Sequence, residues 1–211
     1  DKGADINIQN KNGSTALMYA SIYRNDTSSL GKVKLLLDKG ANINIQDING
    51  WTALMFASQN SNSTSSLETV KLLLDRGADI NIQNNNGSTA LTYASINSNS
   101  TSSLETVKLL LDRGADPFIK NNDNKYPIYV CPKSKPECKM LIAEYMWKRL
   151  YGRDKNTALK YSRQTSIPKD VWEIILLNKR QQELCKNLSN ENNKEILVFF
   201  AREYGILTEG L

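Results

Sequence analysis

The chain has 211 residues, of which 40% are hydrophobic and 23% charged, with a formal net charge of +5 and no histidine. This length suffices for one or two domains with a hydrophobic core, and no apolar run approaches the ~18 residues of a membrane span, so we expect no membrane contact. The lack of histidine removes the commonest general base and zinc ligand, so we expect neither an enzyme nor a bound cofactor.

A period of 37 residues organises the first part of the chain. Gly13, Gly50 and Gly87 stand at that spacing. Residues 60–79 and 97–116 are identical over 20 positions. Such self-similarity is typical of repeat proteins, in which one repeat cannot bury its apolar face alone. Stacking of neighbouring repeats buries it, so we expect one continuous core along the array.

The first part of each repeat predicts a short helix. This helix follows the turn glycine, as in residues 51–58. A threonine stands at its N-cap position, where the hydroxyl can accept a hydrogen bond from the first turn. The threonines at this position are Thr15, Thr52 and Thr89.

A Ser/Asn-rich stretch leads to a longer second helix. Residues 65–68 and 102–105 have the Ser-x-x-Glu pattern of a capping box, which predicts the helix start. Gly77 stands where the helix end needs a left-handed residue. Ile80 and Ile82 then alternate as in an extended arm. The apolar residues that recur at helical spacing in the second helix are Leu67, Val70, Leu73 and Leu74.

The order of these motifs resembles the ankyrin repeat over residues 1 to about 130, with a glycine turn, Thr-x-Leu, Val-x-Leu-Leu-Leu and Gly-Ala-Asp. The resemblance implies an all-α solenoid of helix-turn-helix repeats. Residues 1–150 would hold a partial repeat, three regular repeats and one degenerate terminal repeat. Residues 1–5 match the end of a repeat, so we expect the natural chain to start further upstream.

The repeats depart from the ankyrin pattern in two respects. Their period is 37 rather than about 33 residues. Thr-Ala-Leu followed by Met or Thr stands where the family has Thr-Pro-Leu-His. The hydrogen bonds that the histidine makes between repeats are therefore absent, and another group must tie the repeats together.

The fourth repeat is degenerate. Asn124 replaces the turn glycine, and residues 125–128 replace the Thr-x-Leu motif. Residues 137–151 predict an amphipathic helix that serves as the second helix of this repeat. Its expected buried residues are Met140, Leu141, Tyr145 and Leu150.

Residues 151–211 lose the period and predict a small helical C-terminal segment. The excess positive charge lies toward this end, because residues 117–211 carry 17 basic and 11 acidic residues. One pattern in the segment, aliphatic-Pro-x-acid-aliphatic followed by an Ile pair, resembles the opening of an F-box. Its residues are Ile167, Pro168, Asp170, Val171, Ile174 and Ile175.

Ankyrin repeats with an F-box-like tail are similar to ankyrin-repeat proteins of large DNA viruses and some intracellular bacteria. In such proteins the tail recruits the linker subunit of a cullin-type ubiquitin ligase, and the repeats select the target. The resemblance implies such a substrate receptor in a host cytoplasm. One alternative is a non-catalytic scaffold or masking protein whose tail only caps the array. Another is assembly with copies of itself.

The resemblance also implies where a protein target binds, at the tips of the turns and the inner face of the first helices. Trp51 stands out, because the equivalent position in other repeats holds serine or lysine. We expect it to be partly exposed, either as a binding hot spot or as a cover for the neighbouring turn. The implied partner-binding residues are Lys11, Ser14, Tyr23, Ile48, Asn49, Trp51, Gln59, Asn85, Ser88 and Ile96.

The odd number of cysteines favours a reducing compartment, and we expect a cytoplasmic protein. Cys131 and Cys138 have too few companions for a zinc site, so each is expected to be a small buried hydrophobe. Nucleic-acid binding is a weaker interpretation of the sequence pI near 9.0, because acidic residues are interspersed among the basic residues of the tail.

Overall fold

The computed structural model describes residues 3–22, 27–60, 64–97 and 101–151. These residues form helices joined by hairpin loops, and none of them lies in a β-strand, which confirms the all-α prediction. The chain divides into two compact bodies, Asp1–Cys138 and Lys139–Leu211.

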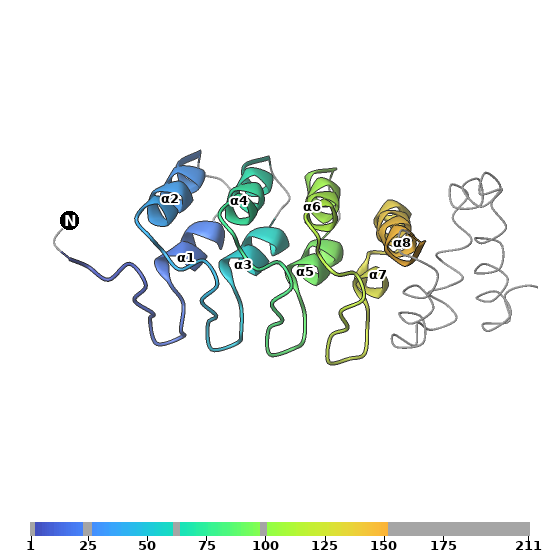
Figure 1. The fold of residues 1–211 in the computed structure, drawn as a ribbon, viewed down its shortest axis with the longest axis horizontal. Helices are drawn as coiled ribbons and strands as arrows, with labels where there is room; N and C mark the ends of the chain where they lie inside the picture. Colours follow the sequence, from blue (N-terminus) through green and yellow to red (C-terminus); the bar gives the residue numbers. More distant parts are fainter. Residues whose placement is uncertain (1–2, 23–26, 61–63, 98–100, 152–211) are drawn as a thin grey trace, which may run out of the picture. The chain divides into compact units, whose positions relative to one another are not determined.

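Each repeat contributes a short helix and a longer one. The short helices are α1 (Ala16–Ile22), α3 (Ala53–Gln59), α5 (Ala90–Ile96) and α7 (Pro127–Val130). The longer helices are α2 (Thr27–Asp38), α4 (Thr64–Asp75), α6 (Thr101–Asp112) and α8 (Pro136–Tyr151). Within the first body, α1, α3, α5 and α7 pack side by side as one row, and α2, α4 and α6 form a second row (Figure 1).

The core of the first body is built from the same positions in successive repeats. In the second repeat Leu54 is 1% exposed, and Val70 and Leu73 are fully buried. Ala57 is also fully buried, and its small side chain lets neighbouring helices approach closely. Each repeat thus covers the apolar face of the next, as a stacked array requires.

Threonine hydroxyls cap the short helices, as predicted. The Thr52 hydroxyl accepts a hydrogen bond from the Met55 N–H at 3.3 Å. Thr89 forms a full capping box with Thr92, in which each side chain pairs with the backbone of the other residue. The hydroxyls satisfy N–H groups that a helix start leaves without intrahelical partners.

The longer helices begin one residue ahead of the predicted capping boxes, whose first serine side chains, Ser65 and Ser102, lie outside the described part of the structure. Helices α4 and α6 begin at Thr64 and Thr101, so the serines of residues 65–68 and 102–105 lie inside the first turn rather than ahead of it. A run of hydroxyl residues offers several cap positions, and the Ser-x-x-Glu spacing alone does not select one.

The longer helices end as predicted, but the arm that follows them is not extended. At the end of α4, Gly77 has a φ of +89°, and the Ala78 N–H donates to the Leu73 carbonyl at 3.0 Å, as in a Schellman motif. Residues 80–81 then form a turn. The carboxylate of Asp79 accepts a hydrogen bond from the Asn81 N–H at 3.0 Å, which favours the turn over a strand.

The fourth repeat keeps its turn without a glycine. Asn124 has a φ of +61°, in the left-handed region that asparagine tolerates better than most residues. Tyr126 is 1% exposed at the N-cap of α7, and Pro127 opens that helix, where its missing N–H costs nothing.

The buried face of α8 differs from the predicted one. Met140 is 45% exposed, whereas Ile142, Ala143 and Met146 are fully buried. Leu141 and Tyr145 are half-buried, and the side chain of Leu150 lies outside the described residues. Apolar residues occur around much of the helix, so their spacing does not specify which face is buried.

The cysteines expected to be separate buried thiols form a pair. Cys131 and Cys138 are 4% and 0% exposed, so their predicted burial is confirmed. Their sulfur atoms are joined as a disulfide, with the two Cα atoms 6.0 Å apart. The short connection between α7 and α8 brings the two Cα atoms within disulfide range.

Candidate partner-binding surface

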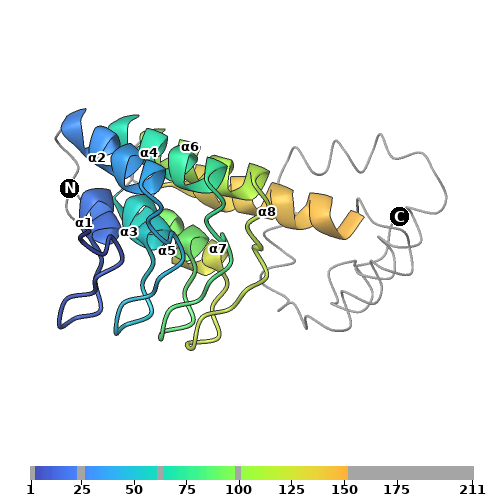
Figure 2. The same ribbon diagram turned by 60° about the vertical axis from the view of Figure 1, so that its left-hand side comes forward.

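A hairpin loop, which we call a finger, precedes each short helix, and the fingers project side by side (Figure 2). The tip of the second finger shows their geometry. The Gly50 N–H donates to the Asp47 carbonyl at 2.8 Å, and the Asp47 N–H donates to the Trp51 carbonyl at 3.0 Å. The Asp47 carboxylate accepts from the N–H groups of Asn49 and Trp51 at 2.9 and 2.8 Å. The tip is therefore a closed hairpin. The fingers comprise residues 6–15, 43–52, 80–89 and 117–126.

Asparagines take the place of Asp47 in the other fingers. Their side-chain oxygen accepts from the backbone N–H four residues on, as Asp47 does from Trp51. The donor and acceptor pairs are Ser14 and Asn10 at 3.0 Å, Ser88 and Asn84 at 3.0 Å, and Lys125 and Asn121 at 2.9 Å. These asparagines build the turns.

Glutamines at the base of the fingers tie neighbouring repeats together. The Gln46 amide donates to the Gly50 carbonyl of its own finger at 2.8 Å and to the Gln83 carbonyl of the next finger at 3.1 Å. Gln9 and Gln83 repeat this arrangement toward Gln46 and Lys120, at 3.2 and 3.1 Å. This glutamine ladder supplies the connection between repeats that the missing histidines left open.

The finger tips are joined as well. The Asn85 N–H donates to the Asn49 carbonyl at 3.0 Å, and the Asn85 side-chain amide donates to the Ile48 carbonyl at 2.9 Å. Asn122 makes the same two bonds to the third finger, both at 2.9 Å. Asn85, predicted to bind a partner, therefore remains exposed but also holds two fingers together.

Successive fingers lie so close that only glycine fits at the contact. A Cβ on Gly50, which has a φ of +77°, would stand 2.8 Å from the backbone nitrogen of Asn85. Together with the hydrogen bonds, this close approach fixes the spacing of the tips. A partner would therefore meet a surface that loses little conformational freedom on binding.

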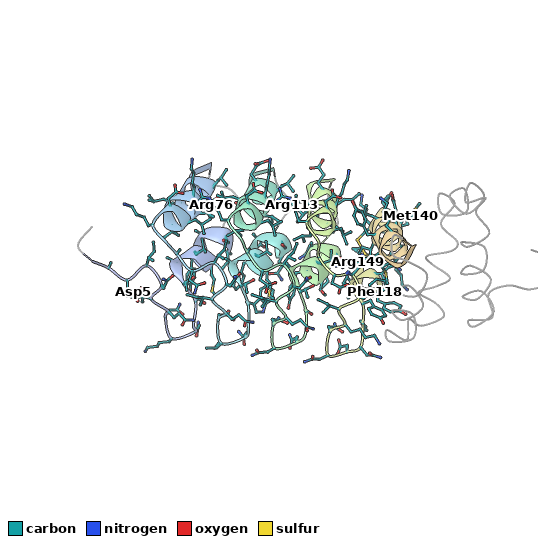
Figure 3. All side chains as sticks on the ribbon, in the orientation of Figure 1. Asp5, Arg76, Arg113, Phe118, Met140 and Arg149 are labelled. Carbon is teal, nitrogen blue, oxygen red and sulfur yellow. A yellow bond between two sulfur atoms is a disulfide. The ribbon has the colours of Figure 1, made fainter. Side chains whose placement is uncertain are left out.

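Ion pairs join the longer helices on the other side of the repeats. Arg76 pairs with Asp38 at 2.8 Å, and Arg113 pairs with Asp75 at 2.6 Å (Figure 3). The four side chains are 36–46% exposed, so water and salt screen these pairs, and each contributes less than about 1 kcal/mol.

Trp51 lies in an aromatic stack. Its ring centroid is 4.8 Å from that of Phe56 in its own repeat and 4.1 Å from that of Tyr93 in the next. The side chain is half-buried, which confirms the expected partial exposure. Both sequence interpretations are compatible with this position, since Trp51 covers a neighbour and keeps an exposed part.

The predicted partner-binding residues differ in accessibility. Ile48 and Ile96 are 61% and 41% exposed. Lys11 and Asn49 are also exposed, and Ser14 and Gln59 are half-buried. Ser88 is only 6% exposed, because it lies inside the closed tip of the third finger. The residues that lie outside the described part of the chain are Tyr23, Ile167, Pro168, Asp170, Val171, Ile174 and Ile175.

Sequence reasoning missed the residues that support this surface. Phe56 and Tyr93 hold the Trp51 ring, and the glutamine ladder holds the fingers. The signal for the ladder was the recurrence of Gln9, Gln46 and Gln83 every 37 residues. A recurrent glutamine in a polar loop has no obvious structural role until the fingers are seen side by side.

The short helices carry no charged residue. Their sequences are ALMYASI, ALMFASQ, ALTYASI and PIYV. The exposed tip residues of the second and third fingers, Ile48, Asn49, Asn85 and Asn86, are also uncharged. This part of the surface offers apolar contacts and amide hydrogen bonds rather than ion pairing.

In the part of the chain that the structure describes, no helix is long and apolar enough to cross a bilayer. Within the same residues, no cluster of three or more His, Cys, Asp or Glu side chains could hold a metal ion.

A family model described as ankyrin repeats (three copies) matches the chain at residues 2–84, 27–121 and 61–146. No curated protein matches the chain. Together the matched ranges extend over residues 2–146, which contain the four fingers and the helices from α1 to most of α8. The chain therefore belongs to the ankyrin-repeat family, whose repeats are protein–protein interaction modules.

Proposed function

We propose that the chain binds a target protein through its fingers and short helices, on a surface centred on Ile48, Asn49 and Trp51 and extending to Gln59 and Ile96. The observation that carries this proposal is that one finger on a rigid frame holds both an exposed aliphatic side chain, Ile48 at 61%, and a half-buried tryptophan, Trp51. Tryptophan is favoured at binding hot spots, and a pre-positioned ring loses little entropy on binding.

The stack around Trp51 supports its role as an anchor. Phe56 and Tyr93 flank the indole with ring centroids 4.8 and 4.1 Å away, so these contacts restrict its rotamers before a partner arrives. Offset aromatic contacts contribute about 0.5–1.5 kcal/mol beyond area burial. The remaining exposed part of the indole is available to an apolar group of the target.

The charge of the surface indicates the chemistry of the target. The short helices carry no charged side chain, and the exposed residues of the second and third finger tips are uncharged, while the half-buried Asp47 carboxylate accepts from two backbone N–H groups of its own tip. The matching patch of the target is therefore expected to be uncharged. It would present apolar and amide or hydroxyl groups. Binding would then depend little on ionic strength, unlike association through opposite charges.

Affinity capture on the immobilised full chain tests this surface. Wild type is compared with Ile48→Asp, with Trp51→Ala and with Lys71→Ala, an exposed substitution on α4 that serves as the matched control. A target that is retained by wild type and Lys71→Ala at 0.5 M salt and lost by both surface variants supports the proposal. Targets retained equally by all four proteins, each shown to be folded by circular dichroism, would place binding elsewhere.

We propose in addition that the tail recruits the linker subunit of a cullin-type ubiquitin ligase. The support is the F-box-like pattern of residues 167–175, which lie outside the described part of the chain. The chain would then be a substrate receptor, with the repeats holding the target and the tail holding the ligase. If the tail only caps the array, the chain is a scaffold or masking protein.

Co-elution of the full chain with the linker subunit, monitored by light scattering, separates these two alternatives. The variant Ile174→Asp/Ile175→Asp is expected to lose a one-to-one complex and to keep the target. Ile48→Asp is the reciprocal control and is expected to keep the linker and lose the target. A folded wild-type chain that forms no complex would leave the tail as a cap.

A further inference from the structure

The first three fingers carry the same dipeptide at their tips. Asn-Gly stands at residues 12–13, 49–50 and 86–87, at the 37-residue period. The asparagines of all three pairs are exposed, so water reaches their side chains. Glycine has no Cβ, so its backbone nitrogen approaches the side chain of the preceding residue more easily than that of any other residue. An asparagine in this position is therefore open to attack by the main chain.

The reaction that follows is deamidation. At the second tip, the Gly50 nitrogen would lose its proton and form a bond to Cγ of Asn49, and the side-chain nitrogen would leave as ammonia. Water then opens the resulting succinimide ring at either of its two carbonyl carbons. One opening gives aspartate, and the other gives isoaspartate, in which the main chain runs through the side-chain carbonyl. Each event consumes one water, releases one ammonia and leaves a carboxylate at neutral pH.

The closed tip opposes this attack by holding the peptide group that must rotate. The Gly50 N–H donates to the Asp47 carbonyl at 2.8 Å. On the other side of the same peptide group, the Asn49 carbonyl accepts from the Asn85 N–H of the next finger at 3.0 Å. Rotation of the Gly50 nitrogen toward the Asn49 side chain would break both hydrogen bonds. The tip must therefore open before the reaction can proceed.

The first and third tips are held in the same way, and the fingers stand side by side (Figure 2). In each tip, the glycine N–H donates within its own finger at 2.8 Å, and the asparagine carbonyl accepts from the next finger. The bonds within a finger run from Gly13 to Asn10 and from Gly87 to Asn84, and those between fingers run from Ile48 to Asn12 and from Asn122 to Asn86, at 3.1 and 2.9 Å.

The third tip is held more firmly than the first. Asn122 binds the third finger through two groups, because its side-chain amide also donates to the Asn85 carbonyl at 2.9 Å. Ile48 stands at the equivalent position next to the first finger, and an isoleucine side chain has no donor. Ile48 therefore contributes only its backbone N–H, and the first tip is expected to open more often than the third.

The fourth finger carries a carboxylate where the other three carry the labile amide. Asp123 is the equivalent of Asn49, and Asn124 takes the place of the glycine. The turn is closed all the same, since the Asn124 N–H donates to the Asn121 carbonyl at 2.9 Å. A tip with aspartate thus keeps its hairpin. Isoaspartate would instead lengthen the main chain by one methylene, at a contact between fingers that leaves no room for a Cβ.

We propose that Asn12, Asn49 and Asn86 are sites of spontaneous deamidation, and that the reaction proceeds only when a finger opens. The rate at each site is then the rate of the unrestrained peptide multiplied by the fraction of time that the tip is open. Modification of Asn49 would place a negative charge on the uncharged surface. That effect on target binding rests on the proposed function, whereas the modification itself does not.

Peptide mapping of the full chain by mass spectrometry, after incubation at pH 8 and 37 °C, tests the proposal. The fraction converted to aspartate and isoaspartate is measured at each site in the folded chain and in the chain unfolded by urea. Folding is expected to slow all three sites by at least about tenfold, and least at Asn12. Asn85 precedes asparagine rather than glycine and is the internal control, expected to react far more slowly in the unfolded chain.

Asn122→Ala tests the contact between fingers directly. The substitution removes the side-chain hydrogen bond to the third finger but lies far from Asn86 in the sequence, so the unfolded rate should not change. The folded rate at Asn86 is expected to rise roughly two- to fivefold, with no change at Asn12. Lys108→Ala, an exposed substitution on α6, is the matched control and should alter neither rate.

Three results would contradict the proposal. Equal rates in the folded and unfolded chains would show that the fingers do not control the reaction. Intact asparagines at the three tips of the unfolded chain would overturn the assignment of the sites. An Asn122→Ala protein, folded by circular dichroism, with an unchanged rate at Asn86 would show that the contact between fingers does not limit opening.

Discussion

The side-chain amide of Asn84 donates a 2.7 Å hydrogen bond to the hydroxyl of Tyr93, and the equivalent positions one repeat earlier hold Asp47 and Phe56. The donor and the hydroxyl are thus present together in the third repeat and absent together in the second. In the first repeat Asn10 and Tyr19 form the same bond at 2.9 Å, but both residues are exposed. The contribution of this hydrogen bond to stability can therefore be compared between the third repeat and the first.

Removing the Tyr93 hydroxyl is expected to destabilise the fold measurably. Tyr93→Phe leaves the amide of the buried Asn84 without its partner, which costs about 1 kcal/mol in the free energy of unfolding. Tyr19→Phe is the matched control, and its cost is expected to be a few tenths of a kcal/mol because water reaches the exposed Asn10. Urea unfolding of both variants measures the difference. Equal costs at the two sites would contradict the role of burial.

Glycine at the finger contact is expected to be irreplaceable. Gly77→Ala is expected to lower the free energy of unfolding by about 1–2 kcal/mol, the cost of a left-handed backbone at alanine. No steric cost is added, because a Cβ at this position would meet nothing within 4 Å. Gly50→Ala adds a clash with the backbone nitrogen of Asn85 and is expected to cost at least about 1 kcal/mol more. Thermal unfolding of the two variants compares them directly. A Gly50→Ala protein as stable as Gly77→Ala would show that the fingers can separate at no cost.

The glutamine ladder is expected to depend on the amide donor. Gln46→Ala loses two hydrogen bonds at an exposed residue and is expected to cost about 1 kcal/mol. Gln46→Glu keeps the shape but sets a carboxylate against two carbonyl oxygens, so a larger cost is expected at pH 7. Gln59→Glu, outside the ladder, is the matched control and should change stability by less than about 0.5 kcal/mol.

Acid is expected to relieve the Gln46→Glu variant specifically. An unperturbed glutamate has a pKa of about 4.3, and below it the carboxyl again carries a donor. Because the charged form is the unfavourable one in the folded state, the folded-state pKa of this carboxyl lies above its unfolded value of about 4.3. The difference in unfolding free energy from wild type should therefore narrow as pH falls through the folded-state pKa, and the relief should be complete below about 4. Urea titrations of both proteins at pH 7 and pH 3.5 measure this, and a constant difference would point to shape rather than charge.

The buried face of α8 makes a further pair of variants informative. Ile142 is fully buried, so Ile142→Ala is expected to cost about 2–4 kcal/mol, from the lost transfer free energy and the cavity. Met140 is 45% exposed, and Met140→Ala is expected to cost less than about 1 kcal/mol. Helical signal during urea unfolding reports both. A larger loss of stability for Met140→Ala than for Ile142→Ala would instead support the buried face that the residue spacing predicted.

Local rules were enough to predict the helices, the caps of the short helices and the C-terminal ends of the longer ones. The Thr52 cap and the Gly77 terminus depend on groups a few residues apart, and these are read directly from the sequence. The start of α4 was missed because adjacent hydroxyl residues compete for one cap. The face of α8 was missed because its apolar residues do not form a single stripe, and only the tertiary surroundings decide between Met140 and Ile142.

Part of the candidate surface could also be predicted from the sequence. The partial exposure of Trp51 followed from its isolation among polar equivalents in other repeats. Its ring contact with Tyr93 joins residues 42 positions apart. The glutamine ladder likewise joins residues 37 apart, so it depends on the register between repeats rather than on a local pattern. Asn85 shows the limit most clearly, because an exposed tip residue proved to hold the neighbouring finger.

The fixed spacing of 37 residues between donor and acceptor in the glutamine ladder has a consequence for how the number of repeats can change. When a segment of one full period is copied within the gene, the new segment carries the glutamine that reaches forward and the carbonyl that receives the bond from behind. No compensating substitution is needed elsewhere. Residues 60–79 and 97–116, identical over 20 positions, have the form that such a copying event would produce. The length of the array can therefore change by whole periods while every junction keeps the same chemistry.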